Sequence, residues 1–232
     1  DTDDVATMGL VIAPDIFGLR PLFDDMVNRL ASVWSMTVCA VEPFPGLDLG
    51  DDVDPRFAAV PGLDDDAHLR DLVEAADATG CDRVGLLGFC MGGMYCFKAA
   101  RSDRFAKIAS FYGMIRLPEA WTGPDQGEPL DHLATGHPGR VLAIIGELDT
   151  YTPPADVVAC SPSNTAASAD FSPSQIQTSA ASMMSGSRYS GRGSFIAEVI
   201  QPPGTADTWR ISFRPSGRFH RKTVPASEPS AL

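Results

Sequence analysis

The stretch that most constrains the fold of this chain is a glycine-rich turn directly behind an apolar run. Residues 84–87 read Val-Gly-Leu-Leu, and residues 88–93 read Gly-Phe-Cys-Met-Gly-Gly. The apolar run is typical of a buried strand, and residues 94–100 favour a helix. A residue on so tight a turn has a strained backbone, and side chains at the flanking glycine positions would collide with the strand and the helix. The segment therefore predicts an elbow that lifts Cys90 from the carboxyl edge of a sheet.

This turn has the pattern of a nucleophile elbow, with cysteine where serine is usual. In such an elbow the sulfur of Cys90 projects from the sheet, and the amide of Met91 faces the place where an oxyanion would form. A second interpretation stays open, because glycine-rich turns also exist for close packing alone. In that case Cys90 is a small buried apolar side chain.

Composition limits the possible function classes. The chain has 232 residues, which predicts one domain with a sizeable core. Its net charge of -12 disfavours nucleic acid and anionic membrane as partners. An odd number of cysteines without a C-x-x-C pair argues against disulfides or zinc and favours a cytoplasmic location. No apolar run approaches the roughly 20 residues of a membrane span, and no metal or nucleotide motif predicts a cofactor. The five cysteines are Cys39, Cys81, Cys90, Cys96 and Cys160.

Strands and helices are expected to alternate in the first 160 residues. Apolar runs predict strands, and apolar residues at helical spacing predict helices. This alternation of strands and helices implies an α/β fold in which a mainly parallel sheet is covered by helices on both faces. The predicted strands are 8–13, 36–41, 84–89, 108–112 and 141–145, and the predicted helices are 21–34, 64–79 and the one that follows the elbow.

The composition changes abruptly near residue 160. Residues 1–160 carry a net charge of -15 and 4 serines, whereas residues 161–232 carry +3 and 15 serines. Residues 1–159 are therefore predicted to be the α/β domain, and residues 160–232 an atypical tail rich in Ser, Pro and Arg. Two explanations of the tail stay open, namely a disordered segment or translation from a shifted reading frame.

Two further segments belong with the elbow. Residues 12–18, Ile-Ala-Pro-Asp-Ile-Phe-Gly, follow the first strand, where Ile16 can offer a second backbone amide and Asp15 a carboxylate near the thiol. Asp15 is alternatively a turn residue. Asp149 lies just beyond the strand at 141–145, where a carboxylate can orient a histidine. Its alternative is a solvated loop acid, although the order nucleophile then acid matches that of the hydrolases.

With the Phe-Tyr-Gly at 111–113, these segments resemble the dienelactone hydrolase family of α/β-hydrolases over residues 8–158. The resemblance implies a Cys-His-Asp triad that hydrolyses enol-lactones or related small esters, as a carboxymethylenebutenolidase does. By position, Cys90 resembles the nucleophile and Asp149 the orienting acid, while the amides of Ile16 and Met91 resemble the oxyanion hole. Asp15 stands where the family often has a glutamate beside the resting thiol.

The chain departs from the family in its histidine, which the family carries after the acid. His68, His132 and His137 all precede Asp149 and are expected at the surface, and His220 lies in a polar segment without a strand or loop to position it. Two functions therefore stay open. The chain is a hydrolase of small lactones or esters, impaired if no histidine serves Cys90, or it is a non-catalytic family member, either the product of a disrupted reading frame or a pseudoenzyme that binds small ligands.

Overall fold

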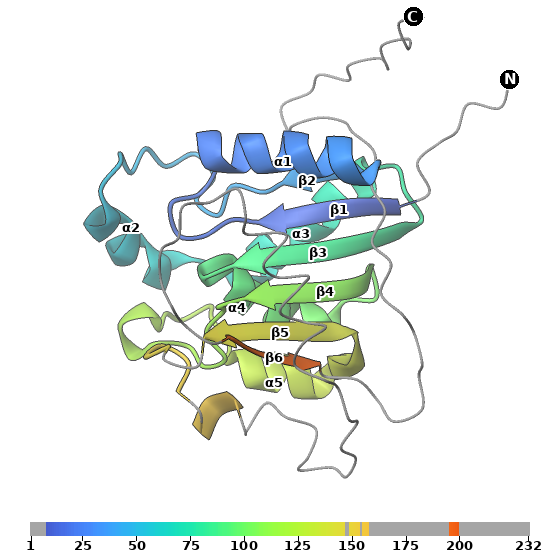
Figure 1. Ribbon diagram of the computed structural model, residues 1–232. Helices are drawn as coiled ribbons and strands as arrows, with labels where there is room; N and C mark the ends of the chain where they lie inside the picture. The colour runs from blue at the N-terminus through green and yellow to red at the C-terminus, as the bar shows by residue number, and fades with distance from the viewer. Residues whose placement is uncertain (1–7, 147–148, 154, 158–194, 200–232) are drawn as a thin grey trace, which may run out of the picture.

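The computed structural model describes residues 8–146, 149–153, 155–157 and 195–199, and a six-stranded sheet forms its centre (Figure 1). The strand order is β2-β1-β3-β4-β5-β6. Neighbouring strands from β2 to β5 are parallel, and β6 pairs antiparallel with β5. The strands are β1 (Met8–Ala13), β2 (Thr37–Ala40), β3 (Arg83–Phe89), β4 (Phe105–Phe111), β5 (Val141–Gly146) and β6 (Phe195–Val199). The expected α/β fold with a mainly parallel sheet is confirmed.

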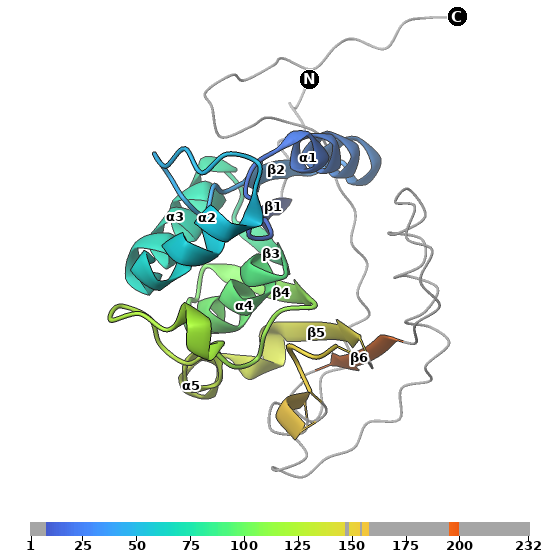
Figure 2. The ribbon, with the colours of Figure 1, turned by 90° about the vertical axis from the view of Figure 1, so that its left-hand side faces the viewer.

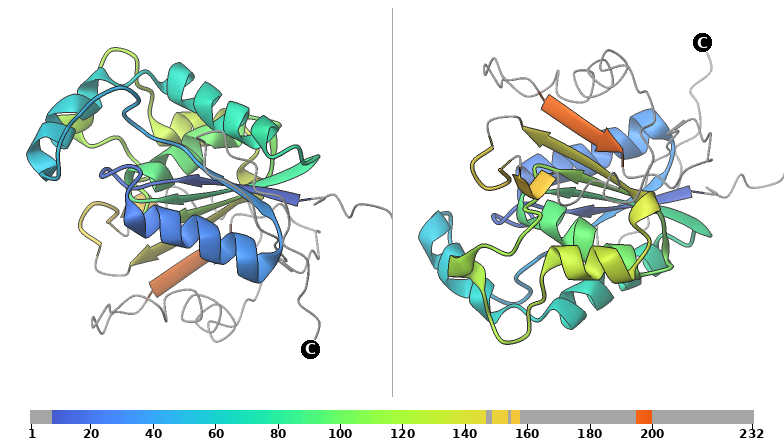
Figure 3. Two further views of the ribbon diagram at one scale, coloured as in Figure 1. Left: turned by 90° about the horizontal axis from the view of Figure 1, so that it is seen from above. Right: turned by 90° about the horizontal axis from the view of Figure 1, so that it is seen from below.

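Helices cover both faces of this sheet (Figures 2 and 3). Helix α1 lies on one face, α3, α4 and α5 lie on the other, and α2 lies beyond the carboxyl edge. The apolar core is divided accordingly, with Phe23 of α1 in one cluster and Leu72 of α3 and Met94 of α4 in the other. The α-helices are α1 (Pro21–Trp34), α2 (Val53–Ala59), α3 (Asp65–Ala78), α4 (Met91–Lys98) and α5 (Pro129–Thr135). Short 3-10 turns span Val60–Gly62, Ala99–Arg101, Glu119–Trp121 and Pro138–Arg140.

The predicted element bounds agree closely with the structure. Helix α1 has its expected bounds, and Pro21 at its first turn supplies a backbone angle that suits a helix start. Asp64 caps α3, because its side chain accepts hydrogen bonds from the amides of Asp66 (2.8 Å) and Ala67 (3.1 Å). Strand β4 begins at Phe105, three residues earlier than predicted.

Strand β6 lies within residues 160–232, which were predicted to be an atypical tail. Its sequence, Phe-Ile-Ala-Glu-Val, combines aromatic and β-branched residues that suit a strand, and it pairs with the outer edge of β5. Residues 158–194 and 200–232 lie outside the described residues. The choice between a disordered tail and a shifted reading frame therefore stays open.

A buried ion pair joins α3 to α4. The ammonium of Lys98 lies 2.8 Å from both carboxylate oxygens of Asp65, and Lys98 is fully buried. The same carboxylate accepts the amide of Gly127 at 2.8 Å, so that Asp65 also holds the loop that leads to α5. Burial lowers the pKa of Lys98, and its hydrogen bonds to Asp65 oppose this shift. The carboxylate of Asp65 thus connects α3, α4 and the loop that leads to α5.

His68 is buried beside this ion pair, which corrects the expectation that it lies at the surface. It is 4% exposed, and its ring centre lies 4.3 Å from that of Tyr95. Its Nδ1 atom has no hydrogen-bond partner among the residues that the structure describes. Burial lowers the pKa of His68 to about 4. His132 is also half-buried rather than exposed, with Nε2 3.7 Å from a carboxylate oxygen of Asp65.

Two properties of the structure concern the membrane spans and disulfides that the sequence analysis considered. Within the described ranges, no helix combines the length and apolar character that a membrane span requires. Cys39, Cys90 and Cys96 are free thiols, and Cys160 lies outside the described residues.

Candidate active site

Cys90 occupies the turn between β3 and α4, at the carboxyl edge of the sheet. Its backbone angles, φ 54° and ψ -115°, belong to a region that side-chain-bearing residues rarely adopt, at a cost of about 1–3 kcal/mol. Its amide donates to the carbonyl of Phe111 on β4 at 3.0 Å, and its carbonyl accepts the amide of Met94 at 2.9 Å. These two bonds hold the strained residue from both sides. The backbone has the strand–turn–helix geometry that the sequence predicts.

Three glycines make this turn possible. A Cβ atom on Gly88 would lie 2.2 Å from the carbonyl oxygen of Gly92, and one on Gly92 would lie 2.1 Å from that of Ala13. A Cβ on Gly93 would lie 2.7 Å from the Cα of Gly113. Real Cβ atoms do not approach other atoms so closely, so a side chain at any of these positions would push the helix away from the sheet.

The sulfur of Cys90 is half-buried and lies among the other predicted site residues. Burial has the largest effect and raises the pKa of Cys90, and the charges of Asp15 and Asp149 raise it further. Backbone hydrogen bonds from Met91 and Ile16 oppose this shift and lower the pKa. At neutral pH Cys90 is therefore a thiol, and a nucleophilic role requires a base to remove its proton.

Asp15 is engaged by a cation of its own loop. Its two carboxylate oxygens lie 2.5 and 2.7 Å from the guanidinium nitrogens of Arg20, and Oδ1 also accepts the amide of Phe17 at 3.0 Å. The turn role considered for Asp15 is thus present, and Arg20 is its charged partner. The negative charge of Asp15 nevertheless still acts on Cys90.

Arg56 reaches the same loop from α2. Its Nη1 lies 3.4 Å from the carbonyl oxygen of Ile16, and its Nη2 donates to the carbonyl of Gly50 at 2.8 Å. Its Nε is buried and has no hydrogen-bond partner among the described residues. No carboxylate of these residues lies within ion-pair distance of the guanidinium. Arg56 therefore places a positive charge beside the loop that carries Ile16. Within the described part of the chain, this charge has no carboxylate as its ion-pair partner.

Asp149 lies in the loop after β5. Its amide donates to the carbonyl of Gly146 at 3.0 Å, and its Oδ1 accepts the amide of Tyr151 at 2.9 Å. The hydroxyl of Thr152 donates to the carbonyl of Gly113 at 3.3 Å, which ties this loop to the backbone beside the elbow. The carboxylate is thus held on the Cys90 side of the sheet, while residues 147 and 148 lie outside the described residues.

The histidines of the described residues make their contacts elsewhere. His68 and His132 belong to the ion-pair cluster between the helices. His137 is partly exposed and lies 2.9 Å from a carboxylate oxygen of Asp103. His220 lies outside the described residues. In the same described part of the chain, no group of three or more His, Cys, Asp or Glu side chains is arranged to hold a metal ion.

Sequence reasoning missed three side chains around the Ile16 loop, namely Arg20, Glu42 and Arg56. Their contacts with this loop span 5, 23 and 40 residues of sequence. Charged residues at such separations give no periodic or motif signal. Only the proximity of the loops after β1 and β2 and the start of α2 brings them together.

A parallel sheet with helices on both faces and an elbow of this kind at its carboxyl edge is the architecture of the α/β-hydrolases. The sequence profile of the dienelactone hydrolase family matches residues 52–172, which is more than half of the chain. The chain belongs to the dienelactone hydrolase family.

Curated relatives share part of their length with this chain. It is 28% identical over 152 residues, 61% of this chain and 59% of the relative, to the "Probable 2-oxo-3-(5-oxofuran-2-ylidene)propanoate lactonase" of Bradyrhizobium sp. It is 28% identical over 130 residues, 54% of this chain and 52% of the relative, to "Carboxymethylenebutenolidase 2" of Cupriavidus pinatubonensis. The chain therefore spans between half and three-fifths of these relatives. A Klebsiella pneumoniae structure described as a dienelactone hydrolase matches the fold with a TM-score of 0.53 at 20% identity, covering 69% of each chain.

Proposed function

We propose that this chain hydrolyses a small lactone or ester through Cys90. The observation that carries the proposal is the position of Cys90 on a strained elbow at the carboxyl edge of the sheet, where backbone hydrogen bonds from Met91 and Ile16 oppose the rise in the pKa of its thiol. A thiol in this position is next to two donors that can stabilise an oxyanion, which is what acyl transfer requires. Membership of the dienelactone hydrolase family supports the same chemistry.

In the proposed reaction, a base removes the proton of Cys90 and the sulfur attacks the carbonyl carbon of the substrate. The carbonyl π electrons move to oxygen, and the N–H groups of Ile16 and Met91 stabilise the resulting oxyanion. When the oxyanion collapses, the ring C–O bond of the lactone breaks, the released oxygen takes the proton from the base, and a thioester remains on Cys90. Water then hydrolyses the thioester, which releases the acid and restores the thiol.

The base is the part of the mechanism that the described residues leave open. Asp149 could orient a histidine near Cys90, but His68, His132 and His137 make their contacts elsewhere. None of the three histidines among the described residues is therefore placed to act as the base for Cys90. Without one, turnover should fall by about 10²–10⁴-fold, because that is what general-base assistance contributes.

The positive charge of Arg56 near the site favours a substrate that carries a carboxylate. Arg56 lies against the carbonyl of Ile16 and has no carboxylate within ion-pair distance in the described ranges. A guanidinium beside an oxyanion loop is well suited to bind a second anionic group of the substrate. The printed names of both curated relatives refer to substrates with a carboxylate, since one is a propanoate and the other a carboxymethylene compound.

Two cysteine variants test the nucleophile. Cys90→Ala should abolish hydrolysis of p-nitrophenyl acetate and the labelling of residue 90 by iodoacetamide. Cys96→Ala is the matched control, because Cys96 lies in α4, the helix that follows Cys90, but is fully buried, and it should keep both signals. Parent-level hydrolysis by Cys90→Ala would refute the proposed nucleophile. Labelling of Cys90 without turnover would instead favour a family member that does not catalyse.

Arg56→Gln tests the preferred charge of the substrate. It should raise KM for an enol-lactone carboxylate by about 10–100-fold, because a hydrogen bond to a charged group contributes roughly 1.5–3 kcal/mol. The KM for neutral p-nitrophenyl acetate should stay near that of the parent. An equal change for both substrates would mean that Arg56 acts on the fold of the loop and not on the anion.

A further inference from the structure

We propose that Glu42 is a positioning residue for the oxyanion loop, residues 14–20, and keeps the N–H group of Ile16 directed at the sulfur of Cys90. The proposal deepens the proposed function and rests on it, since the loop is called an oxyanion loop on the strength of that function. Glu42 itself contacts neither the sulfur nor a reacting atom.

Glu42 bridges two loops at the carboxyl edge. It follows β2, and the loop it holds follows the neighbouring parallel strand β1. Its Oε2 accepts the amide of Leu19 at 2.8 Å, and its Oε1 accepts the amide of Phe44 at 3.0 Å. Phe44 is only 2% exposed, so the carboxylate is tied to a well-packed part of the core. The tip of the oxyanion loop is therefore anchored to the core through one side chain.

Gly18 leaves the space that this carboxylate occupies. Its φ of +67° is typical of glycine, and a Cβ atom there would lie 2.5 and 2.6 Å from the two carboxylate oxygens of Glu42. The carboxylate thus packs directly against the backbone of Gly18. Since the amide of Gly18 also donates to the carbonyl of Asp15 at 2.9 Å, the turn and the glutamate fit one another closely.

The other amides of the loop are also engaged. Phe17 donates to the side chain of Asp15, and the amide of Gly92 on the elbow helix donates to the carbonyl of Pro14 at 3.1 Å. These bonds fix the turn and the base of the loop, and Glu42 fixes its tip. The amide of Ile16 lies between these anchors in the sequence, and a backbone hydrogen bond from Ile16 lowers the pKa of Cys90. Releasing the tip should therefore move this N–H group away from Cys90.

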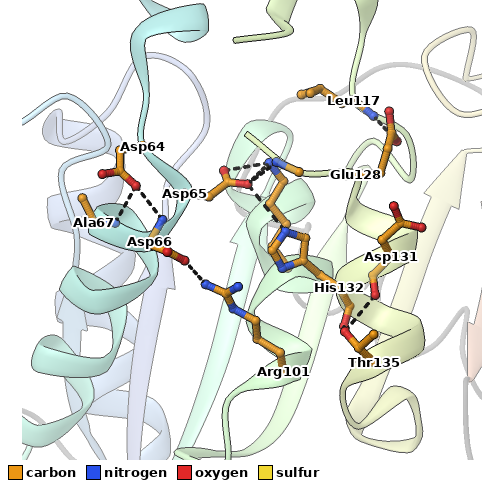
Figure 4. Close-up of polar contacts among 12 residues, drawn as sticks. Asp64, Asp65, Asp66, Ala67, Arg101, Leu117, Glu128, Asp131, His132 and Thr135 are labelled. Atoms are coloured by element: carbon orange, nitrogen blue, oxygen red, sulfur yellow. Dashed lines mark hydrogen bonds and ion pairs between the residues drawn. The ribbon is translucent and has the colours of Figure 1, made fainter. Parts of the chain in front are cut away.

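The experiment compares Glu42→Ala and Glu42→Gln with Glu128→Ala. Glu128 is a matched control because its carboxylate accepts the amide of Leu117 at 3.1 Å in another loop, the one after β4 (Figure 4). The first readout is the pH midpoint of Cys90 alkylation by iodoacetamide, followed by peptide mapping. The second is kcat and KM for p-nitrophenyl acetate. Melting curves of each full-length variant show whether it is folded.

Glu42→Ala should raise the alkylation midpoint by about one pH unit, because a donor that stabilises the thiolate is lost. Its kcat should fall by about 10²-fold, with KM within about threefold, since a misplaced donor acts mainly on the transition state. Glu42→Gln keeps one acceptor oxygen and similar volume and should lie between parent and Glu42→Ala. Glu128→Ala should match the parent in both readouts.

Gly18→Ala gives an independent check. Its Cβ would displace the carboxylate of Glu42, and its φ of +67° is strained for alanine, so it should raise the alkylation midpoint in the parent and by less in Glu42→Ala, where only the strain remains. An unchanged midpoint in both folded Glu42 variants, or an equal rise in Glu128→Ala, would overturn the positioning role. Parent-level turnover in Cys90→Ala would defeat the proposed function instead, so the two failures are distinct.

Discussion

Replacing His68 by phenylalanine should make the stability of this protein less sensitive to acid. Burial lowers the pKa of His68 from 6.5 to about 4, while the charge of Asp65 favours the protonated ring and that of Lys98 opposes it. Between these two pH values the unfolded chain holds a proton that the folded chain lacks. The stabilisation is therefore fully present above about pH 6.5 and is lost as the pH falls towards 4. The difference corresponds to about 3 kcal/mol of unfolding free energy at the acid end.

The assay is urea unfolding, followed by tryptophan fluorescence, from about pH 7 to about pH 4. His68→Phe keeps an aromatic ring against Tyr95, and His68→Gln keeps a polar side chain, yet neither titrates in this range. In both variants, the loss of unfolding free energy on acidification should be smaller than in the parent by about 3 kcal/mol. The two replacements pack differently. If both variants lose less unfolding free energy on acidification than the parent, the effect therefore comes from the missing titration of His68 and not from a change in packing. A parent-like loss in both variants would refute the conclusion that His68 is buried in its neutral form.

Two further predictions concern the packing behind the elbow. Lys98→Met should destabilise the protein by about 3–5 kcal/mol in urea unfolding, because it leaves the carboxylate of Asp65 buried without its counter-charge. Adding Asp65→Asn should recover most of this loss, and a double variant no more stable than the single one would contradict the pairing. Gly92→Ala should lower stability by about 3 kcal/mol, since its Cβ would lie 2.1 Å from a backbone carbonyl oxygen. Gly85→Ala, whose Cβ would be 3.4 Å from its nearest neighbour, is the control, and equal melting temperatures for the two would contradict the close-packing explanation.

The elbow could be predicted because its signals are local. An apolar run, a glycine on each side of Cys90 and a helix-compatible segment all lie within residues 84–100, and each dictates the backbone of its immediate neighbourhood. Helix α1 was predicted with its observed bounds for the same reason. The parallel sheet then follows from the alternation of strands and helices, because parallel strands need crossover connections.

The burial of His68 had a signal that the sequence analysis did not use. His68 lies four residues before Leu72 and seven before Ala75, so it shares the buried face of α3. Lys98 and Asp65 had no comparable signal, because their burial depends on each being the partner of the other across 33 residues. A charged side chain is buried only where the fold supplies its counter-charge. The cytoplasmic location and the two-part division of the chain stay predictions.

By itself, the sequence determined the order of strands β1 to β5 and of helices α1, α3 and α4, the strained turn under Cys90 and membership of the dienelactone hydrolase family. These features depend on the spacing of apolar residues and glycines over a few neighbouring positions, and the local backbone conformation follows from that spacing. Only the tertiary structure decided which charges meet, namely Asp15 with Arg20, Asp65 with Lys98, and Glu42 with the amide of Leu19. Such pairings depend on how loops approach one another after packing, since electrostatic and hydrogen-bond partners are chosen by distance in space and not by distance along the chain.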